Sequence, residues 1–92
     1  MAETIKAASK VEIYTKDYCP YCTKAKLLLG QLGVAFDEID LTKDPEKLAE
    51  LQARRPGART VPQIFINGEG IGGCDDLYGL HEAGTLREKL GV

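Results

Sequence analysis

The chain has 92 residues, a net charge of −2 at pH 7, and ordinary proportions of hydrophobic (43%) and charged (28%) residues. This length allows one domain around one hydrophobic core, so residues 1–92 are expected to form a single domain. The mild acidity gives no electrostatic reason to bind nucleic acid or an anionic membrane surface.

The amino terminus, MAETIKAASK, contains no apolar run that could serve as a signal peptide. No other stretch is apolar enough to predict a membrane span. We expect residues 1–9 to be a frayed end or a short extension. These features favour a cytoplasmic location, where most thiols are kept reduced, so a structural disulfide among the three cysteines is not expected.

The first part of the chain predicts a strand, a helix and a second strand. Residues 10–16 (KVEIYTK) are rich in β-branched and aromatic side chains, which favour a strand. From Cys19 the apolar residues recur at helical spacing, and Gly30 and Gly33 end that pattern. Residues 34–41 (VAFDEIDL) return to rough alternation, which predicts the second strand.

A second helix is predicted after the Asp44-Pro45 pair. Asp44 is expected to cap this helix, with Pro45 in its first turn, where the missing N–H does no harm. Leu48 and Leu51 would form its buried stripe. The helix should end before Pro56, because the residue preceding a proline disfavours helical geometry.

A hairpin is predicted next. Residues 60–66 (TVPQIFI) favour a strand, and the Asn67-Gly68 pair that follows is a strong signal for a tight two-residue turn. Residues 69–72 would then form a strand antiparallel to the preceding one.

The last part of the chain predicts two short helical segments. Gly72 and Gly73 break the hairpin strand, and Asp75 or Asp76 is expected to cap a helix that extends to about residue 82. Residues 85–90 add one or two further helical turns. The order β-α-β-α-β-β-α, with a right-handed crossover between the first two strands, predicts an α/β thioredoxin fold. Its four-stranded mixed sheet would be flanked by helices.

Cys19 and Cys22 enclose a Pro-Tyr pair at the predicted start of the first helix. Unpaired N–H groups and the positive end of the helix dipole favour an anion there, and Lys16 adds positive charge. Because a stabilised thiolate is a better leaving group, we expect Cys19 to attack a disulfide and to be expelled afterwards. Cys22, one turn further along the helix, would be the resolving thiol.

Other interpretations of the cysteines remain open from these residues alone. The pair could be two buried core thiols. Cys19, Cys22, Cys74 and His81 could form a zinc site, although the pair opens a leucine-rich helix rather than a glycine-rich loop. Cys19 and thiols from outside the chain could also hold an iron–sulfur cluster shared by two chains, which the rigid Pro20 makes less favourable. A redox pair fits the pattern best, and no bound metal is expected.

Three motifs, in order along the chain, resemble those of a class I (dithiol) glutaredoxin of the bacterial type. They are CPYC at 19–22, TVPQIFI at 60–66 and IGGCDDLY at 71–78. Thioredoxins, the nearest alternative, carry Trp-Cys-Gly-Pro-Cys, whereas this chain has no tryptophan. The resemblance implies a protein that uses glutathione as reductant and acts on protein disulfides and protein–glutathione mixed disulfides. We expect a monomer, although an edge strand or Cys74 could mediate weak pairing.

The resemblance also implies a groove for glutathione. Val61 and Pro62 resemble the cis-proline turn of the family, where the backbone of Val61 would pair with the cysteine of glutathione. N–H groups at the start of the predicted 75–82 helix would bind the γ-glutamyl carboxylate, and an aspartate would pair with its ammonium. The residues of this helix start are Gly73, Cys74, Asp75 and Asp76.

The glycine carboxylate of glutathione requires a cation at the opposite end of that groove. Lys16 is the first candidate. Arg59 belongs to an arginine cluster that adds positive charge, whereas Arg54 and Arg55 fit a solvated surface role at least as well.

Two more side chains would line the groove: Thr60, and Tyr21 as a wall beside the Cys19 sulfur. Cys74 is expected to be buried and inert, with its backbone N–H at the groove. A redox-sensitive Cys74 is the alternative.

Overall fold

The computed structural model describes residues 10–58 and 60–91. Residues 1–9, for which a frayed end is predicted, lie outside this range. The elements, in chain order, are β2 (Val11–Thr15), α1 (Pro20–Gln31), β3 (Asp37–Asp40), α2 (Lys47–Arg54), β4 (Gln63–Ile66), β5 (Glu69–Gly72), α3 (Cys74–Glu82) and α4 (Thr85–Leu90). None of these helices is both long and apolar enough to cross a bilayer.

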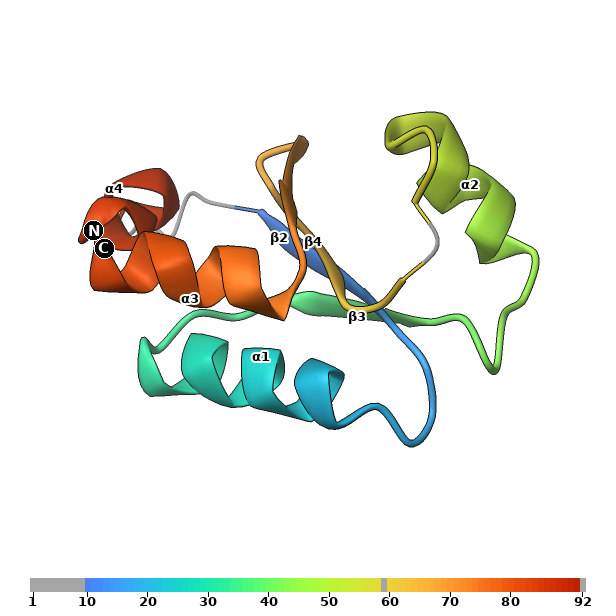
Figure 1. The fold of residues 1–92 in the computed structure, drawn as a ribbon, viewed down its shortest axis with the longest axis horizontal. Helices are drawn as coiled ribbons and strands as arrows, with labels where there is room; N and C mark the ends of the chain where they lie inside the picture. The colour runs from blue at the N-terminus through green and yellow to red at the C-terminus, as the bar shows by residue number, and fades with distance from the viewer. Residues whose placement is uncertain (1–9, 59, 92) are drawn as a thin grey trace, which may run out of the picture.

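The strands form one mixed sheet in the order β3-β2-β4-β5. β2 and β3 are parallel, as expected for two strands joined through helix α1. β4 lies antiparallel to both β2 and β5. Figure 1 shows the sheet between α1 and α3 on one face and α2 on the other. The predicted four-stranded thioredoxin fold is confirmed.

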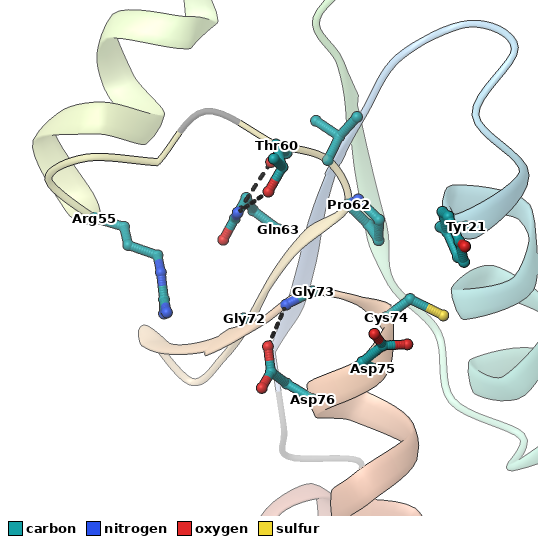
Figure 2. Close-up of a pocket in the computed structure, with 11 residues that line it drawn as sticks. Tyr21, Arg55, Thr60, Pro62, Gln63, Gly72, Gly73, Cys74, Asp75 and Asp76 are labelled. Carbon is teal, nitrogen blue, oxygen red and sulfur yellow. Dashed lines mark hydrogen bonds between the residues drawn. The ribbon is translucent and has the colours of Figure 1, made fainter.

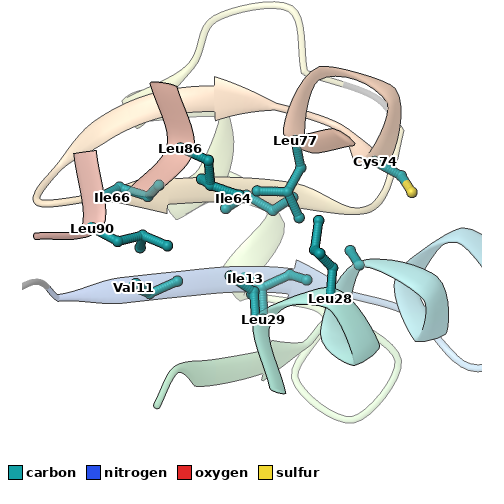
Figure 3. Close-up of a cluster of buried hydrophobic side chains, with 11 residues drawn as sticks. Val11, Ile13, Leu28, Leu29, Ile64, Ile66, Cys74, Leu77, Leu86 and Leu90 are labelled. Atoms are coloured by element: carbon teal, nitrogen blue, oxygen red, sulfur yellow. The ribbon is translucent and has the colours of Figure 1, made fainter. Parts of the chain in front are cut away.

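The main core lies between the sheet and helices α1, α3 and α4. Successive side chains of a strand point to opposite faces, so Val11 and Ile13 of β2 and Ile64 and Ile66 of β4 share this face. Figure 3 shows the helix side chains that pack on them. The helical members are Ala25, Leu28, Leu29, Cys74, Leu77, Leu86 and Leu90.

The opposite face holds a smaller core beneath α2. Tyr14 and Phe65 are fully buried there, with their ring centroids 5.7 Å apart in an edge-to-face arrangement. Leu51 is the one fully buried leucine that α2 contributes. Apolar packing under α2 is therefore limited, and polar contacts supplement it.

Arg54 supplies most of those polar contacts. Its guanidinium pairs with Glu12 at 2.8 Å and lies 4.0 Å from the centre of the Phe65 ring. It also donates to the Tyr14 hydroxyl at 3.0 Å, and that hydroxyl donates to Glu50 of α2 at 2.7 Å. The expectation of a solvated Arg54 is therefore wrong, because this side chain clamps the end of α2 to the sheet.

The start of α2 also differs from the prediction. Asp44 does not cap the helix: the cap residue is Glu46, and its side chain makes no capping hydrogen bond. Instead, the N–H groups of Lys47 and Leu48 bond to the carbonyls of Asp44 and Pro45, three residues earlier. A tight turn therefore precedes the helix. Of the two leucines predicted to be buried, Leu51 is buried and Leu48 is exposed.

Two strands are shorter than predicted, for different reasons. β3 is confined to Asp37–Asp40, because residues 34–36 first close the end of α1, where the Val34 N–H bonds to the Leu29 carbonyl. β4 begins only at Gln63, since Pro62 has no N–H for a ladder bond. The hairpin turn is confirmed, with positive φ at both Asn67 and Gly68.

Replacing Arg54 should destabilise the fold. In Arg54→Leu, Glu12 loses its partner at a mostly buried position, and Tyr14 loses one donor. We expect a loss of about 1–3 kcal/mol in the free energy of unfolding, measured by urea titration. Arg87→Leu, on the exposed face of α4, is the matched control and should stay within about 0.5 kcal/mol. Equal effects of the two changes would contradict the clamp.

The same contact predicts a pH dependence. The hydrogen bond from Arg54 is the main cause that lowers the pKa of Glu12 in the folded protein. A lowered folded pKa gives stabilisation that is full above the unfolded value, about 4.3, and is lost as the pH falls through the folded value. The stability difference between wild type and Glu12→Gln should therefore shrink below about pH 4.

Urea unfolding at a series of pH values measures this difference. Glu82→Gln is the comparison, because Glu82 is exposed and has no ion pair among the described residues. A Glu12→Gln difference that stays constant down to pH 3 would contradict the assignment.

Candidate active site

Helix α1 begins at Cys19. This residue is the N-cap, with extended backbone angles, and Pro20 occupies the first helical position. Its sulfur accepts a hydrogen bond from the Cys22 N–H at 3.1 Å. A sulfur therefore takes the place that a Ser or Asp oxygen commonly fills at a helix start. Tyr18, just before it, has φ +58° and is fully exposed.

Cys22 lies one turn inside α1 and is only 2% exposed. Burial raises the pKa of the Cys22 thiol to about 12, and its hydrogen bond with Cys19 acts in the same direction. A backbone hydrogen bond with Lys16 and the charge of Lys26 act in the opposite direction. The two cysteines therefore have different environments: one caps the helix and is partly exposed, the other is buried. Both thiols are free in this structure.

The Val61-Pro62 peptide bond is cis, as the resemblance implied. The Cys19 sulfur lies 3.8 Å from the Val61 carbonyl oxygen, so the start of α1 and the loop before β4 meet at this sulfur. Gly73 approaches the same loop from the other side: a Cβ placed on it would lie 3.4 Å from the Pro62 carbonyl. Three segments distant in sequence therefore converge on one point.

A groove of about 450 Å³ extends from this point. Figure 2 shows Tyr21 of α1, Pro62 and the start of α3 around it. Eight predicted site residues line the groove: Tyr21, Thr60, Val61, Pro62, Gly73, Cys74, Asp75 and Asp76. They come from three separate segments of the chain. Their assignment to glutathione remains a prediction.

Helix α3, whose start lines the groove, has a different N-cap residue from the one predicted. Gly73, rather than an aspartate, is the N-cap residue. Asp76 lies in the first turn and accepts a hydrogen bond from the Gly73 N–H at 3.0 Å. Gly72 has φ +115°, and a Cβ there would overlap the Asp76 carboxylate. Glycine is required at this position for both reasons.

Cys74 is buried against the main core, as expected, and burial raises the pKa of its thiol. Among the described residues, no group of three or more His, Cys, Asp or Glu side chains could hold a metal ion. The zinc set of Cys19, Cys22, Cys74 and His81 is therefore not assembled.

Lys16 does not line the groove. It borders a second pocket, of about 500 Å³, that also contacts Cys19 and Cys22. Lys16 could therefore pair with the glycine carboxylate only if glutathione extended from the groove, past the Cys19 sulfur, into the second pocket. Arg59, the other predicted cation, lies outside the described residues.

Two groove residues were not predicted: Gly72 and Gln63. Arg55, for which a solvated surface role fitted at least as well as a role in the groove, also lines it. Arg55 lies over β5, where a Cβ on Gly70 would come within 2.9 Å of its guanidinium. A glycine inside a strand is the signal that could have indicated this close approach. The buried Gln63 donates to the Thr60 carbonyl at 2.9 Å and so fixes the loop before the cis peptide.

Comparison with known proteins identifies the family. The glutaredoxin family model matches residues 11–71 of the chain. The chain belongs to the glutaredoxin family. It is 54% identical over 89 residues to a probable glutaredoxin of Synechocystis sp., an alignment that covers 97% of this chain and 80% of the relative. It is 51% identical over 82 residues to glutaredoxin 3 of Escherichia coli strain K12, covering 89% and 98%.

A solved structure supports the same conclusion. The buckwheat glutaredoxin–glutathione complex superposes with a TM-score of 0.77 at 38% identity, covering 91% of this chain and 78% of that chain. This glutaredoxin is of the bacterial type and is a glutathione-dependent disulfide oxidoreductase.

Gly72→Ala should lower the stability of this glutaredoxin more than Gly84→Ala does. Gly84 also has a positive φ, +80°, but a Cβ there would meet nothing within 4 Å. Gly84→Ala should therefore cost only the conformational strain, about 1–2 kcal/mol. Gly72→Ala should cost at least about 1 kcal/mol more, because it also displaces the Asp76 cap. Thermal unfolding measures both, and equal losses would contradict the role of the cap.

Proposed function

We propose that this protein reduces protein disulfides and protein–glutathione mixed disulfides, with Cys19 as the attacking and leaving thiol and Cys22 as the resolving thiol. The observation that carries this proposal is the 3.1 Å hydrogen bond from the Cys22 N–H to the Cys19 sulfur. A donor at this distance stabilises negative charge on the sulfur, and the start of α1 adds a favourable dipole.

In the monothiol mode, the Cys19 thiolate attacks the glutathione sulfur of a mixed disulfide. A Cys19–glutathione disulfide forms and the protein thiolate leaves. A second glutathione thiolate then attacks the glutathione sulfur, oxidised glutathione departs, and the Cys19 thiolate returns to its place at the helix start. Each exchange forms one S–S bond and breaks one.

In the dithiol mode, Cys19 attacks a protein disulfide and forms a mixed disulfide with the protein. The Cys22 thiolate then attacks the Cys19 sulfur, and the second protein thiolate leaves. Two glutathione molecules re-reduce the resulting Cys19–Cys22 disulfide. The hydrogen bond from the Cys22 N–H to the Cys19 sulfur, which keeps that sulfur next to Cys22, supports this exchange.

The groove supports a glutathione site next to Cys19. The backbone of Val61 lies outside the β4 ladder and beside the Cys19 sulfur, so it is positioned to pair with the glutathione cysteine. The first residues of α3 line the same groove, and the N–H groups there other than that of Gly73, which already bonds to Asp76, would receive the γ-glutamyl carboxylate. Tyr21 and Thr60 would form the walls, while Lys16 or Arg59 would supply a cation.

We also propose that the protein acts as a monomer in the cytoplasm. The outer strand β3 carries acidic side chains, Asp37, Glu38 and Asp40, along one edge of the sheet. Charged edge strands disfavour pairing between chains. The glutathione chemistry proposed here requires a compartment with reduced glutathione, as the cytoplasm provides.

Two serine variants test the roles of the thiols. Cys19→Ser should lower activity on a glutathionylated peptide by more than about 100-fold, because no thiolate remains to attack. Cys22→Ser should keep this activity within about threefold while losing the reduction of a protein disulfide, which needs the resolving thiol. Glutathione-coupled assays with the two substrates measure this difference. Loss of all deglutathionylation in Cys22→Ser would overturn the monothiol assignment.

A further inference from the structure

The dithiol mode requires the Cys22 thiol to lose its proton, and nothing in the glutathione groove explains how it does so. Cys22 must be a thiolate when it attacks, yet burial raises its pKa to about 12. A thiol whose pKa is raised in this way is almost entirely protonated at neutral pH. Any nearby positive charge that stabilises the Cys22 thiolate therefore increases the reactive fraction directly.

The second pocket contains such a charge. Lys26 lines this pocket together with both cysteines. It follows Cys22 by four residues on α1, so the two side chains are neighbours on one face of the helix. The Lys26 side chain is 32% exposed, which leaves its charge less screened than that of a free surface lysine.

Neighbouring side chains hold the Lys26 ammonium in place. It donates to the Glu38 carboxylate at 2.9 Å, and the same oxygen accepts from the buried Thr15 hydroxyl at 2.7 Å. These two hydrogen bonds lower the pKa of Glu38, which keeps it ionised at neutral pH. Glu38 is thus an anchor for Lys26, and its negative charge partly offsets the charge of the lysine.

Other charges also face this pocket. They come from the loop before α1 and from β3, and they include both signs. The titratable groups around the pocket are Lys16, Asp17, Tyr18, Cys19, Cys22, Lys26, Glu38 and Asp40. Lys26 is the lysine among them whose charge acts directly to favour the Cys22 thiolate.

We propose that Lys26 assists the resolving step: anchored by Glu38 and Thr15, its ammonium stabilises the thiolate that forms on Cys22. The inference rests on the dithiol mode proposed above and extends it to a residue outside the glutathione groove. Lys26 is a positioning residue in this scheme, because it forms no bond with the substrate. The second pocket is thereby assigned to the resolving step.

The step balances in atoms and charge. The Cys22 thiol releases its proton to water in the pocket. The thiolate attacks the Cys19 sulfur of the mixed disulfide, an S–S bond forms between Cys22 and Cys19, and the bond from Cys19 to the substrate sulfur breaks. The substrate leaves as a thiolate and takes up a proton from solvent. No further oxidant or reductant is needed.

An aromatic disulfide with a coloured thiolate separates the two exchanges in one experiment. The reduced full-length protein, in excess, is mixed with this disulfide in a stopped-flow instrument. Attack by Cys19 releases the first equivalent of coloured thiolate, and resolution by Cys22 releases the second. Cys22→Ser identifies the second phase, because this variant lacks the release whose rate is independent of protein concentration and keeps only the slower exchange between molecules.

Lys26→Gln should slow the second phase about threefold to tenfold and change the first phase by less than about twofold. Lys24→Gln is the matched control. It removes the same charge from the same helix, but the Lys24 ammonium lies 4.9 Å from the Tyr78 ring centre and acts on Cys74 rather than Cys22. The control should leave the second phase unchanged.

Two further variants separate a charge effect from a structural effect. Lys26→Arg keeps the charge and should restore most of the second-phase rate. Glu38→Gln keeps an oxygen that can accept from Lys26 and Thr15 while it removes the negative charge, so it should accelerate the second phase. If the Lys26–Glu38 pair only stabilised the fold, Lys26→Gln and Glu38→Gln would change the second-phase rate in the same direction.

A pH series from 6 to 9 adds an independent readout. The second-phase rate should rise about tenfold per pH unit in wild type, and Lys26→Gln should lower the whole line without changing its slope. Slowing by Glu38→Gln, or equal slowing of both phases by Lys26→Gln, would overturn the role of Lys26. Absence of a second phase in the wild type would instead overturn the dithiol mode itself.

Discussion

The hydrogen bond at the start of α1 is the interaction on which the active site depends. Because Cys19 is the N-cap, its sulfur is held at 3.1 Å from the Cys22 N–H and at the end of a helix dipole. The same cap brings the sulfur to 3.8 Å from the carbonyl oxygen of Val61, a residue that lines the groove. Cys19, Cys22 and the groove are therefore fixed relative to one another by the place where one helix begins.

The helix gives the two cysteines different surroundings, and the proposed division of the chemistry between them rests on this difference. Cys19 is partly exposed and faces the loop of the cis peptide, whereas Cys22 packs one turn deeper and is almost fully buried. Burial protects the Cys22 thiol from solvent oxidants and competing disulfides, but it also opposes its ionisation. A cation anchored on the neighbouring strand, as Lys26 is by Glu38, offsets part of that cost without exposing the sulfur.

Local signals in the sequence were enough to predict most of the fold. The Asn67-Gly68 turn and the helix start at Cys19 rest on interactions between residues close in sequence, and both are confirmed. The misses involve distant contacts. No local pattern shows that Arg54 reaches Glu12 across the sheet. A glycine inside a strand, Gly70, indicates a close approach but does not show that Arg55 makes it. Lys16 was placed in the groove by its position in sequence, whereas the structure turns it toward the second pocket.

The attachment of α2 by the Arg54 clamp gives the two faces of the sheet different responses to solvent. Excluded salts such as sulfate strengthen apolar packing, which is more extensive under α1 and α3 than under α2. The charge pair beneath α2 gains nothing from such salts and is only weakly screened by them, because it is mostly buried. A single change of ionic medium therefore tightens one wall of the molecule more than the other. Amide exchange would register this asymmetry first in α2, next to the Arg55 end of the groove.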